Sequence, residues 1–167
     1  MKSNENPPFP TAPLKPSEII NQAFLFLEFA VKLFTHAELG RLNPSDFNIP
    51  VEMRLEDGVL KLDHPVFDSP HEITNAAHNM VMLALGLTAT SLYSAIETTG
   101  IGQGDPDKHL RDLCDLVYMI RCAFAQPDQM IRPVWQVGGT FAREMRLTLP
   151  SGPLVLNMRA FDDGSSI

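Results

Sequence analysis

Cysteine is scarce in this sequence, and its two copies are badly placed to bond to each other. Cys114 and Cys122 stand eight residues apart in a segment of helical pattern. Eight residues of helix separate two Cα atoms by ~12 Å, whereas a disulfide needs Cα atoms within ~7 Å. We therefore expect two free thiols. Free thiols suit a reducing compartment, so the predicted location is cytoplasmic.

Basic residues are also few, and long uninterrupted apolar runs are missing. There are 13 lysines and arginines against 20 acidic residues, giving a net charge of −7. This balance argues against a broad basic surface for duplex DNA or an anionic membrane. The most apolar stretch, AFLFLEFAVKLF, is broken by Glu28 and Lys32, and no basic-then-apolar pattern opens the chain. We expect no secretion signal and no membrane span.

The length and composition are those of one soluble domain. The chain has 167 residues, of which 44% are hydrophobic and 20% are charged, and single domains commonly have ~100 to 200 residues. Residues 1–16 contain five prolines and are predicted to form a flexible arm. Residues 17–161 are predicted to form the globular domain, and residues 162–167 a frayed tail.

The first helix is predicted over residues 17–39. Ser17 after a proline is a good N-cap, and Gly40 supplies a left-handed stop. Apolar residues recur at spacings of three and four, and further phenylalanines and leucines widen the apolar face. We therefore expect this helix to be buried on more than one side.

The second helix is predicted over residues 70–98, with Ser69 as N-cap and Gly100 as its end. Small residues, Gly86 among them, should let another helix approach closely. Its predicted inner stripe alternates small and large side chains: Ile73, Ala77, Met80, Ala84, Leu87, Ser91 and Ala95.

The third helix is predicted over residues 106–125, with Asp105 as N-cap. Its apolar stripe faces the core or a partner and consists of Leu110, Leu113, Val117, Ile120 and Phe124. The glycine-rich GIGQG before it lacks both the strand and the Lys-Ser/Thr ending of a phosphate loop, so we interpret it as a turn.

Two segments have the period-two pattern of antiparallel strands. Residues 51–62 predict a hairpin with a turn at Asp57-Gly58, whose apolar face packs on helices. Residues 133–161 predict a C-terminal antiparallel sheet that includes PVWQV as a short strand and turns back at 150–153. The expected opposite pairs are Leu55 with Leu60 and Met53 with Leu62 in the first hairpin, and Leu149 with Leu154, Leu147 with Leu156 and Met145 with Met158 in the second. The sequence thus predicts an α+β fold of three long helices, an inserted hairpin and a C-terminal antiparallel sheet.

Neither a metal site nor a cofactor site is predicted. His64, His71 and His78 stand seven apart, and seven helical residues span ~10 Å, too far for two imidazoles to bind one ion. No serine lies in a GxSxG turn, and neither cysteine has a histidine near it in the sequence.

Arg121 is the strongest single candidate for a functional residue. It stands in the last turn of the third predicted helix, at the edge of the apolar stripe, and Gln126 follows directly before Pro127. Because a residue before proline is pushed out of helical geometry, the side chains of Arg121 and Gln126 can converge at the helix end. A structural role is the plainer interpretation, since a cation in the last turn stabilises the helix dipole by ~0.3 to 1 kcal/mol.

The segment RCAFAQ resembles the Arg-x4-His motif of the HEPN helical family, especially its RNAFAH form followed by a P-x-W strand, as in RPVW here. Arg121 matches the motif arginine, Cys122 replaces the polar residue that usually follows, and Gln126 replaces the histidine. The resemblance covers the third helix directly and the second more loosely, and leaves the hairpins unexplained. It implies a homodimer paired through the third helix, which in active members forms a composite ribonuclease cleft.

Gln126 changes what the resemblance implies. Histidine exchanges a proton near neutral pH, whereas glutamine only donates and accepts hydrogen bonds. General acid–base catalysis contributes ~10²- to 10⁴-fold, so we expect a binding or regulatory module with a degenerate motif, with RNA or a nucleotide as the candidate ligand. One alternative is a weak RNA-processing enzyme that uses Arg121. Another is a small-ligand-binding protein with a pocket between helices and sheet.

Overall fold

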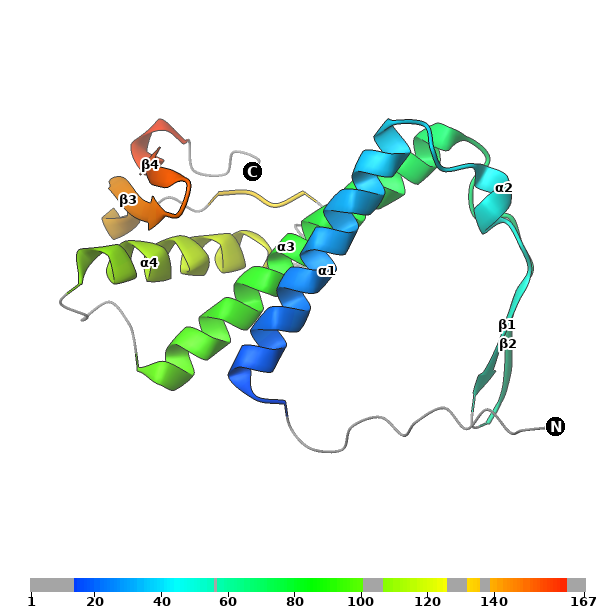
Figure 1. The fold of residues 1–167 in the computed structure, drawn as a ribbon, viewed down its shortest axis with the longest axis horizontal. Helices are drawn as coiled ribbons and strands as arrows, with labels where there is room; N and C mark the ends of the chain where they lie inside the picture. Colours follow the sequence, from blue (N-terminus) through cyan, green and yellow to red (C-terminus); the bar gives the residue numbers. More distant parts are fainter. Residues whose placement is uncertain (1–13, 56, 101–106, 126–131, 136–138, 162–167) are drawn as a thin grey trace.

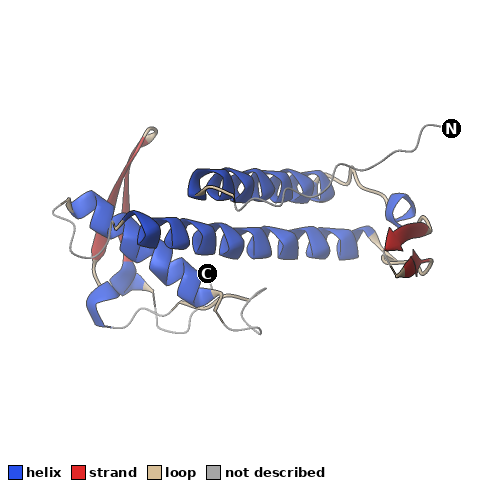
Figure 2. Ribbon diagram, turned by 90° about the horizontal axis from the view of Figure 1, so that it is seen from below, coloured by secondary structure: helices blue, strands red, loops and turns tan. Residues whose placement is uncertain are grey.

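The computed structural model describes residues 14–55, 57–100, 107–125, 132–135 and 139–161, and these form the predicted α+β fold (Figure 1). The long helices are α1 (Pro16–Glu38), α3 (Pro70–Thr99) and α4 (Lys108–Ala123). Between α1 and α3 lie the short helix α2 (Pro44–Phe47) and the strands β1 (Val51–Leu55) and β2 (Gly58–Leu62). After α4 follow the 3-10 turn η2 (Gly139–Phe141), the strands β3 (Glu144–Leu149) and β4 (Gly152–Asn157), and the 3-10 turn η3 (Met158–Ala160). The two hairpins lie at opposite ends of the long helices (Figure 2).

Most of the first predicted arm, the GIGQG turn, Gln126 and the tail 162–167 lie outside the described residues. Within the described part, α1 begins earlier than predicted. Its N-cap is Lys15 and not Ser17, because Pro16 suits the first helical position. The Glu18 carboxylate accepts a hydrogen bond from the Lys15 backbone N–H at 2.9 Å. The predicted stop at Gly40 is confirmed, with φ of 64°.

The predicted ends of α3 are confirmed, whereas the start of α4 is not where we predicted it. The Ser69 hydroxyl accepts a hydrogen bond from the Glu72 backbone N–H at 3.4 Å, and Gly100 ends the helix with φ of 72°. The cap of α4 is Asp107 instead of Asp105: its carboxylate accepts from the backbone N–H of His109 at 2.8 Å. Asp105 itself lies outside the described residues.

Helices α1 and α3 pack antiparallel along a line of small side chains. Ala23, Ala30 and Ala37 are buried at a spacing of seven on α1. The Thr88 hydroxyl of α3 lies 3.1 Å from the Ala23 carbonyl oxygen and 2.7 Å from that of Ala84. These contacts confirm the predicted close approach, since only small residues allow two backbones to come this near.

The expectation that α1 is buried on more than one side is wrong. Among the described elements, only α3 packs extensively against it. The half of α1 that faces away from α3 therefore stays exposed, including Phe24, Leu25, Phe29 and Val31.

Helix α3 also has the length and composition to cross a membrane, with a mean hydropathy of 1.4 over 18 residues, 22% of which are buried within the chain. Core helices of soluble proteins meet the same criterion. The expectation of no membrane span was based on the polar interruptions in α1, and it stays a prediction, as does the cytoplasmic location.

Both hairpins form where predicted, but each register differs from the prediction by two residues. Leu55 pairs with Gly58 and Met53 with Leu60, while Leu149 pairs with Gly152 in the second hairpin. The glycine takes the first position after the turn, where Gly152 has φ of 122°, a conformation that favours glycine. The remaining pairs follow the same shift, Val51 with Leu62, Leu147 with Leu154 and Met145 with Leu156.

The first hairpin does not pack on the helices, contrary to prediction. All ten of its strand residues are exposed. The C-terminal unit behaves differently, since Met119 of α4 forms a buried cluster with Trp135, Met145 and Met158. Of the predicted PVWQV strand, only Val134 forms an isolated bridge among the described residues.

Candidate functional site

Arg121 lies in the last turn of α4, and its guanidinium covers an aromatic ring of α3. The Cζ atom is 4.6 Å from the centroid of the Tyr93 ring. Arg121 is partly exposed, and among the described residues it forms no ion pair under 4 Å. A cation–π contact of this kind contributes ~0.5 to 1 kcal/mol at an exposed site. The ring of Tyr93 therefore holds the guanidinium in place, and no described carboxylate neutralises its charge by an ion pair.

An aromatic row connects this arginine to the C-terminal sheet. The rings of Tyr93 and Tyr118 have centroids 5.6 Å apart at 46°. Tyr118 in turn stacks on Phe141 of η2, at 5.6 Å and 29°. Three separate elements thus fix the surroundings of Arg121, because offset aromatic pairs at this distance are favourable contacts. We call Tyr93, Tyr118, Arg121 and Cys122 the arginine–tyrosine cluster.

The phenols of this cluster remain protonated at neutral pH. A hydrogen bond to the Glu97 carboxylate, with burial as a second cause, raises the pKa of Tyr93 above its ordinary value. A hydrogen bond with the sulfur of Cys122 raises the pKa of Tyr118 in the same way. A phenol with a raised pKa is a weak acid, and its conjugate base is not populated near pH 7.

No described imidazole replaces the histidine that RCAFAQ lacks. Within the described part of the chain, His109 bonds to the Arg146 carbonyl at the other end of α4, and His78 packs edge-on against Phe34. Nor do the described residues gather three or more histidine, cysteine or acidic side chains in the manner of a metal site. The predicted convergence of Arg121 with Gln126 stays a prediction, because Gln126 lies outside the described residues.

A shallow apolar groove of about 190 Å³ lies on α3 beside the end of α4. Its lining consists of Leu83, Gly86, Leu87, Thr90 and Phe124. The Phe124 ring sits directly over Gly86, where an added Cβ would lie 2.8 Å from its Cγ. The predicted close approach at Gly86 is therefore confirmed. Leu87, predicted to lie on the inner stripe, is 51% exposed at this groove instead.

The predicted stripe of α4 is divided between core and surface. Val117 and Phe124 are buried within the chain, whereas Leu113 is 41% exposed. Since α4 contacts both α3 and β3, two sides of it are already covered by its own chain. Pairing of α4 with a second copy stays a prediction.

An ionic cluster that the sequence did not reveal joins α4 to β3. The Asp112 carboxylate is fully buried and accepts hydrogen bonds from Lys108 Nζ at 2.7 Å and from the Arg146 backbone N–H at 2.9 Å. Arg143 bonds to Asp112 and also to Asp115, the latter at 2.6 Å. Burial opposes ionisation of Asp112, but the hydrogen bonds outweigh it and hold its pKa well below the ordinary value. This cluster is saturated by its own partners, so its role is to fix β3 on α4.

In comparisons with known proteins, no family model matches the chain, and no curated protein or solved structure is detectably similar to it. The RCAFAQ pattern indicated Arg121 and Cys122 but not their tyrosine neighbours. A local signal existed, because Tyr118, Arg121 and Cys122 stand at spacings of three and four and share one face of a helix.

Proposed function

We propose that this chain is a HEPN-like module that binds RNA or a nucleotide without cleaving it efficiently, and that it acts as a homodimer. The observation that carries the proposal is the position of Arg121, whose guanidinium lies over Tyr93 with no described carboxylate in an ion pair with it. A guanidinium is well suited to phosphate because its donors match phosphate oxygens in pairs. The partly exposed rings of Tyr93 and Tyr118 beside it are aromatic groups of the kind on which a base can stack.

Three features favour binding over catalysis. The described neighbours of Arg121 are phenols, a carboxylate and a thiol, and both phenols have raised pKa values. None of these groups is a histidine, the usual general base near neutral pH. Gln126, which stands where the motif has its histidine, cannot exchange a proton at that pH either.

The apolar groove beside Phe124 supports a homodimer in which the C-terminal ends of the two α4 helices meet. Leu83 and Leu87 are exposed there, beside the motif residue Phe124. This exposed apolar strip next to the end of α4 can pack against the same strip of a second protomer. Such pairing would bring the Arg121 side chains of the two protomers towards each other. This supports the pairing through the end of α4 that the resemblance implies.

The small-ligand alternative receives less support. The groove between α3 and α4 has about 190 Å³, and a second one, between the start of α1 and the end of α3, has about 140 Å³. Small-molecule sites usually have ~300 to 1,000 Å³. These two hollows are too small for a typical metabolite. A larger one of about 360 Å³ lies at the exposed tip of the first hairpin, and not between the helices and the sheet.

Binding is tested by fluorescence anisotropy with a labelled single-stranded RNA of mixed sequence and with a labelled adenine nucleotide. We expect Arg121→Ala to weaken binding of one of these probes about tenfold or more, since hydrogen bonds to charged groups contribute ~1.5 to 3 kcal/mol. Arg54→Ala, which removes an exposed arginine from the distant first hairpin, is the matched control and should leave binding unchanged. Equal losses in both variants, or no binding by the unmodified protein, would refute the proposal.

A further inference from the structure

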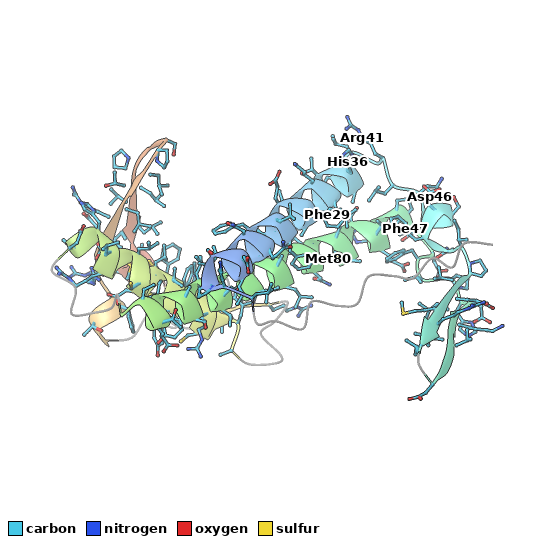
Figure 3. The ribbon with its side chains drawn as sticks, turned by 60° about the horizontal axis from the view of Figure 1, so that its bottom comes forward. Phe29, His36, Arg41, Asp46, Phe47 and Met80 are labelled. Carbon is cyan, nitrogen blue, oxygen red and sulfur yellow. The ribbon has the colours of Figure 1, made fainter. Side chains whose placement is uncertain are left out.

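The first hairpin exposes an apolar face that nothing in the described chain covers. Figure 3 shows β1 and β2 standing clear of α1 and α3, beyond the short helix α2 that holds Asp46 and Phe47. One side of this hairpin carries five apolar residues that are between 43% and 55% exposed, namely Val51, Met53, Leu55, Leu60 and Leu62. The other side is mainly polar, with Val59 as its one apolar strand residue and an ion pair of 2.8 Å between Lys61 and Glu52. Only the apolar side is therefore suited to a partner.

The base of the hairpin is clamped by one side chain, Asn48. Its carboxamide oxygen accepts hydrogen bonds from the backbone N–H groups of Val66 at 2.7 Å and Phe67 at 3.1 Å. Its amide nitrogen donates to the Phe67 carbonyl at 2.7 Å. The Phe47 and Phe67 rings meet edge-on at 5.7 Å in the same place. These contacts fix the base of the hairpin beside α2, and the strands β1 and β2 extend from it.

A two-stranded hairpin in water is only marginally stable without a surface to pack against. The same chain offers a surface of that kind, because the outward half of α1 exposes Phe24, Leu25, Phe29 and Val31 by between 44% and 60%. We propose that a second copy of this chain covers both faces at once. The β1–β2 hairpin of one protomer packs on the outward half of α1 of the other, and the reverse contact forms by two-fold symmetry.

The size of the two faces fits a dimer. Nine half-exposed large side chains present on the order of 700 Å² of apolar surface, and one partner of a standard interface contributes ~800 Å². Two-fold symmetry repeats each contact with the roles of the two protomers exchanged. A contact between one strand face and one helix face therefore covers both apolar faces of both protomers, whereas self-pairing of either face alone would leave the other exposed to water.

This arm contact uses a different surface from the groove at Phe124 and does not depend on RNA binding. Either interface can exist without the other. One substitution in the arm contact and one in the groove at Phe124 therefore distinguish the two interfaces.

Photo-crosslinking tests the arm contact directly. Met53 is replaced by benzoylphenylalanine in the full chain, and protein of natural isotope content is mixed with ¹⁵N-labelled protein before illumination. We expect cross-links of mixed isotope content that map to residues 24–31. Cross-links confined to a single chain, whether to α1 or to residues 1–13, would overturn the proposal, and so would a monomer in light scattering at micromolar concentration.

Matched substitutions supply the second test. In a Leu87→Glu background, which removes pairing at the groove, Met53→Glu should weaken dimer formation at least tenfold in sedimentation equilibrium, because it places a charge in the apolar contact. Arg54→Glu, on the polar side of the same strand, should change it less than twofold. Circular dichroism checks that the helices are retained, which we expect because the hairpin does not contribute to their packing. If Leu87→Glu disrupts the dimer while Met53→Glu does not, the groove at Phe124 is the interface and the arm contact is refuted.

Discussion

The guanidinium of Arg121 and the ring of Tyr93, which come from different helices, meet at 4.6 Å between Cζ and the ring centroid. This contact holds the guanidinium against α3 in the free chain. A planar guanidinium can lie on a ring by a cation–π contact and still donate hydrogen bonds from its edge. The structural contact of Arg121 is therefore compatible with the binding role proposed for it.

The contact between Arg121 and Tyr93 should be measurable as a coupling energy. We expect Tyr93→Leu and Arg121→Ala to interact by about 0.5 to 1 kcal/mol in a double-mutant cycle of unfolding free energies. Tyr93→Phe keeps the ring and loses the bond to Glu97, so its effect should be nearly additive with that of Arg121→Ala. Additive effects in the first cycle would show that the contact does not form in solution.

Introducing a histidine at position 126 tests whether the RCAFAQ segment works like the Arg-x4-His motif that it resembles. Bulk RNA incubated with the unmodified protein should remain intact, and Gln126→His should produce cleavage because it supplies a proton carrier five residues after Arg121. Adding Arg121→Ala to that variant should abolish the gained cleavage. Cleavage by the unmodified protein that Arg121→Ala removes would instead favour the enzyme alternative.

Asp112 should make the domain sensitive to acid. Its pKa is lowered on folding, so the stability that its charge contributes is present above the unfolded pKa of ~3.9 and is lost as the pH falls through the folded value. We expect Asp112→Asn to lower the unfolding free energy by about 3 kcal/mol at pH 7. Urea titrations should show a smaller deficit at pH 3. Asp46→Asn, at an exposed position, is the control, and a deficit for Asp112→Asn that does not shrink at acid pH would contradict the assignment.

Gly86 offers a test in which packing opposes helix propensity. Alanine is favoured over glycine by ~1 kcal/mol inside a helix, but here its Cβ would lie 2.8 Å from the Phe124 ring. We expect the clash to dominate, so that Gly86→Ala destabilises the domain by about 1 to 2 kcal/mol in thermal unfolding. Combining it with Phe124→Leu should cost less than the sum of the two single changes. A stabilised Gly86→Ala protein would show that Phe124 moves aside freely.

The helices and hairpins could be predicted because their signals are local. Ser69 and Gly100 mark the ends of α3 by their own hydrogen-bonding and backbone preferences. The exact registers could not be predicted, since alternation in sequence is equally satisfied by two registers in which the partner of each residue differs by two positions. The apolar pattern of α1 likewise indicates that Phe24 and Phe29 favour burial, but it does not identify the element that would pack against them.

The candidate site was predictable only in part. The RCAFAQ pattern identified Arg121, but its contact with Tyr93 depends on how α3 and α4 cross, and no local pattern encodes that crossing. The hydrogen bond that Asp112 receives from β3 also depends on the tertiary fold. The only partner of Asp112 that the local sequence indicated is Lys108, four residues earlier on the same helix.

The continuous helix α3 sets the distance between the first hairpin and the arginine. Pro70, near the clamped hairpin, and Tyr93, beside the arginine, belong to this one helix and are separated by roughly 35 Å at ~1.5 Å per residue. One unbroken helix of that length connects the two ends of the domain. A group as small as a nucleotide at Arg121 would therefore not reach the hairpin of its own chain.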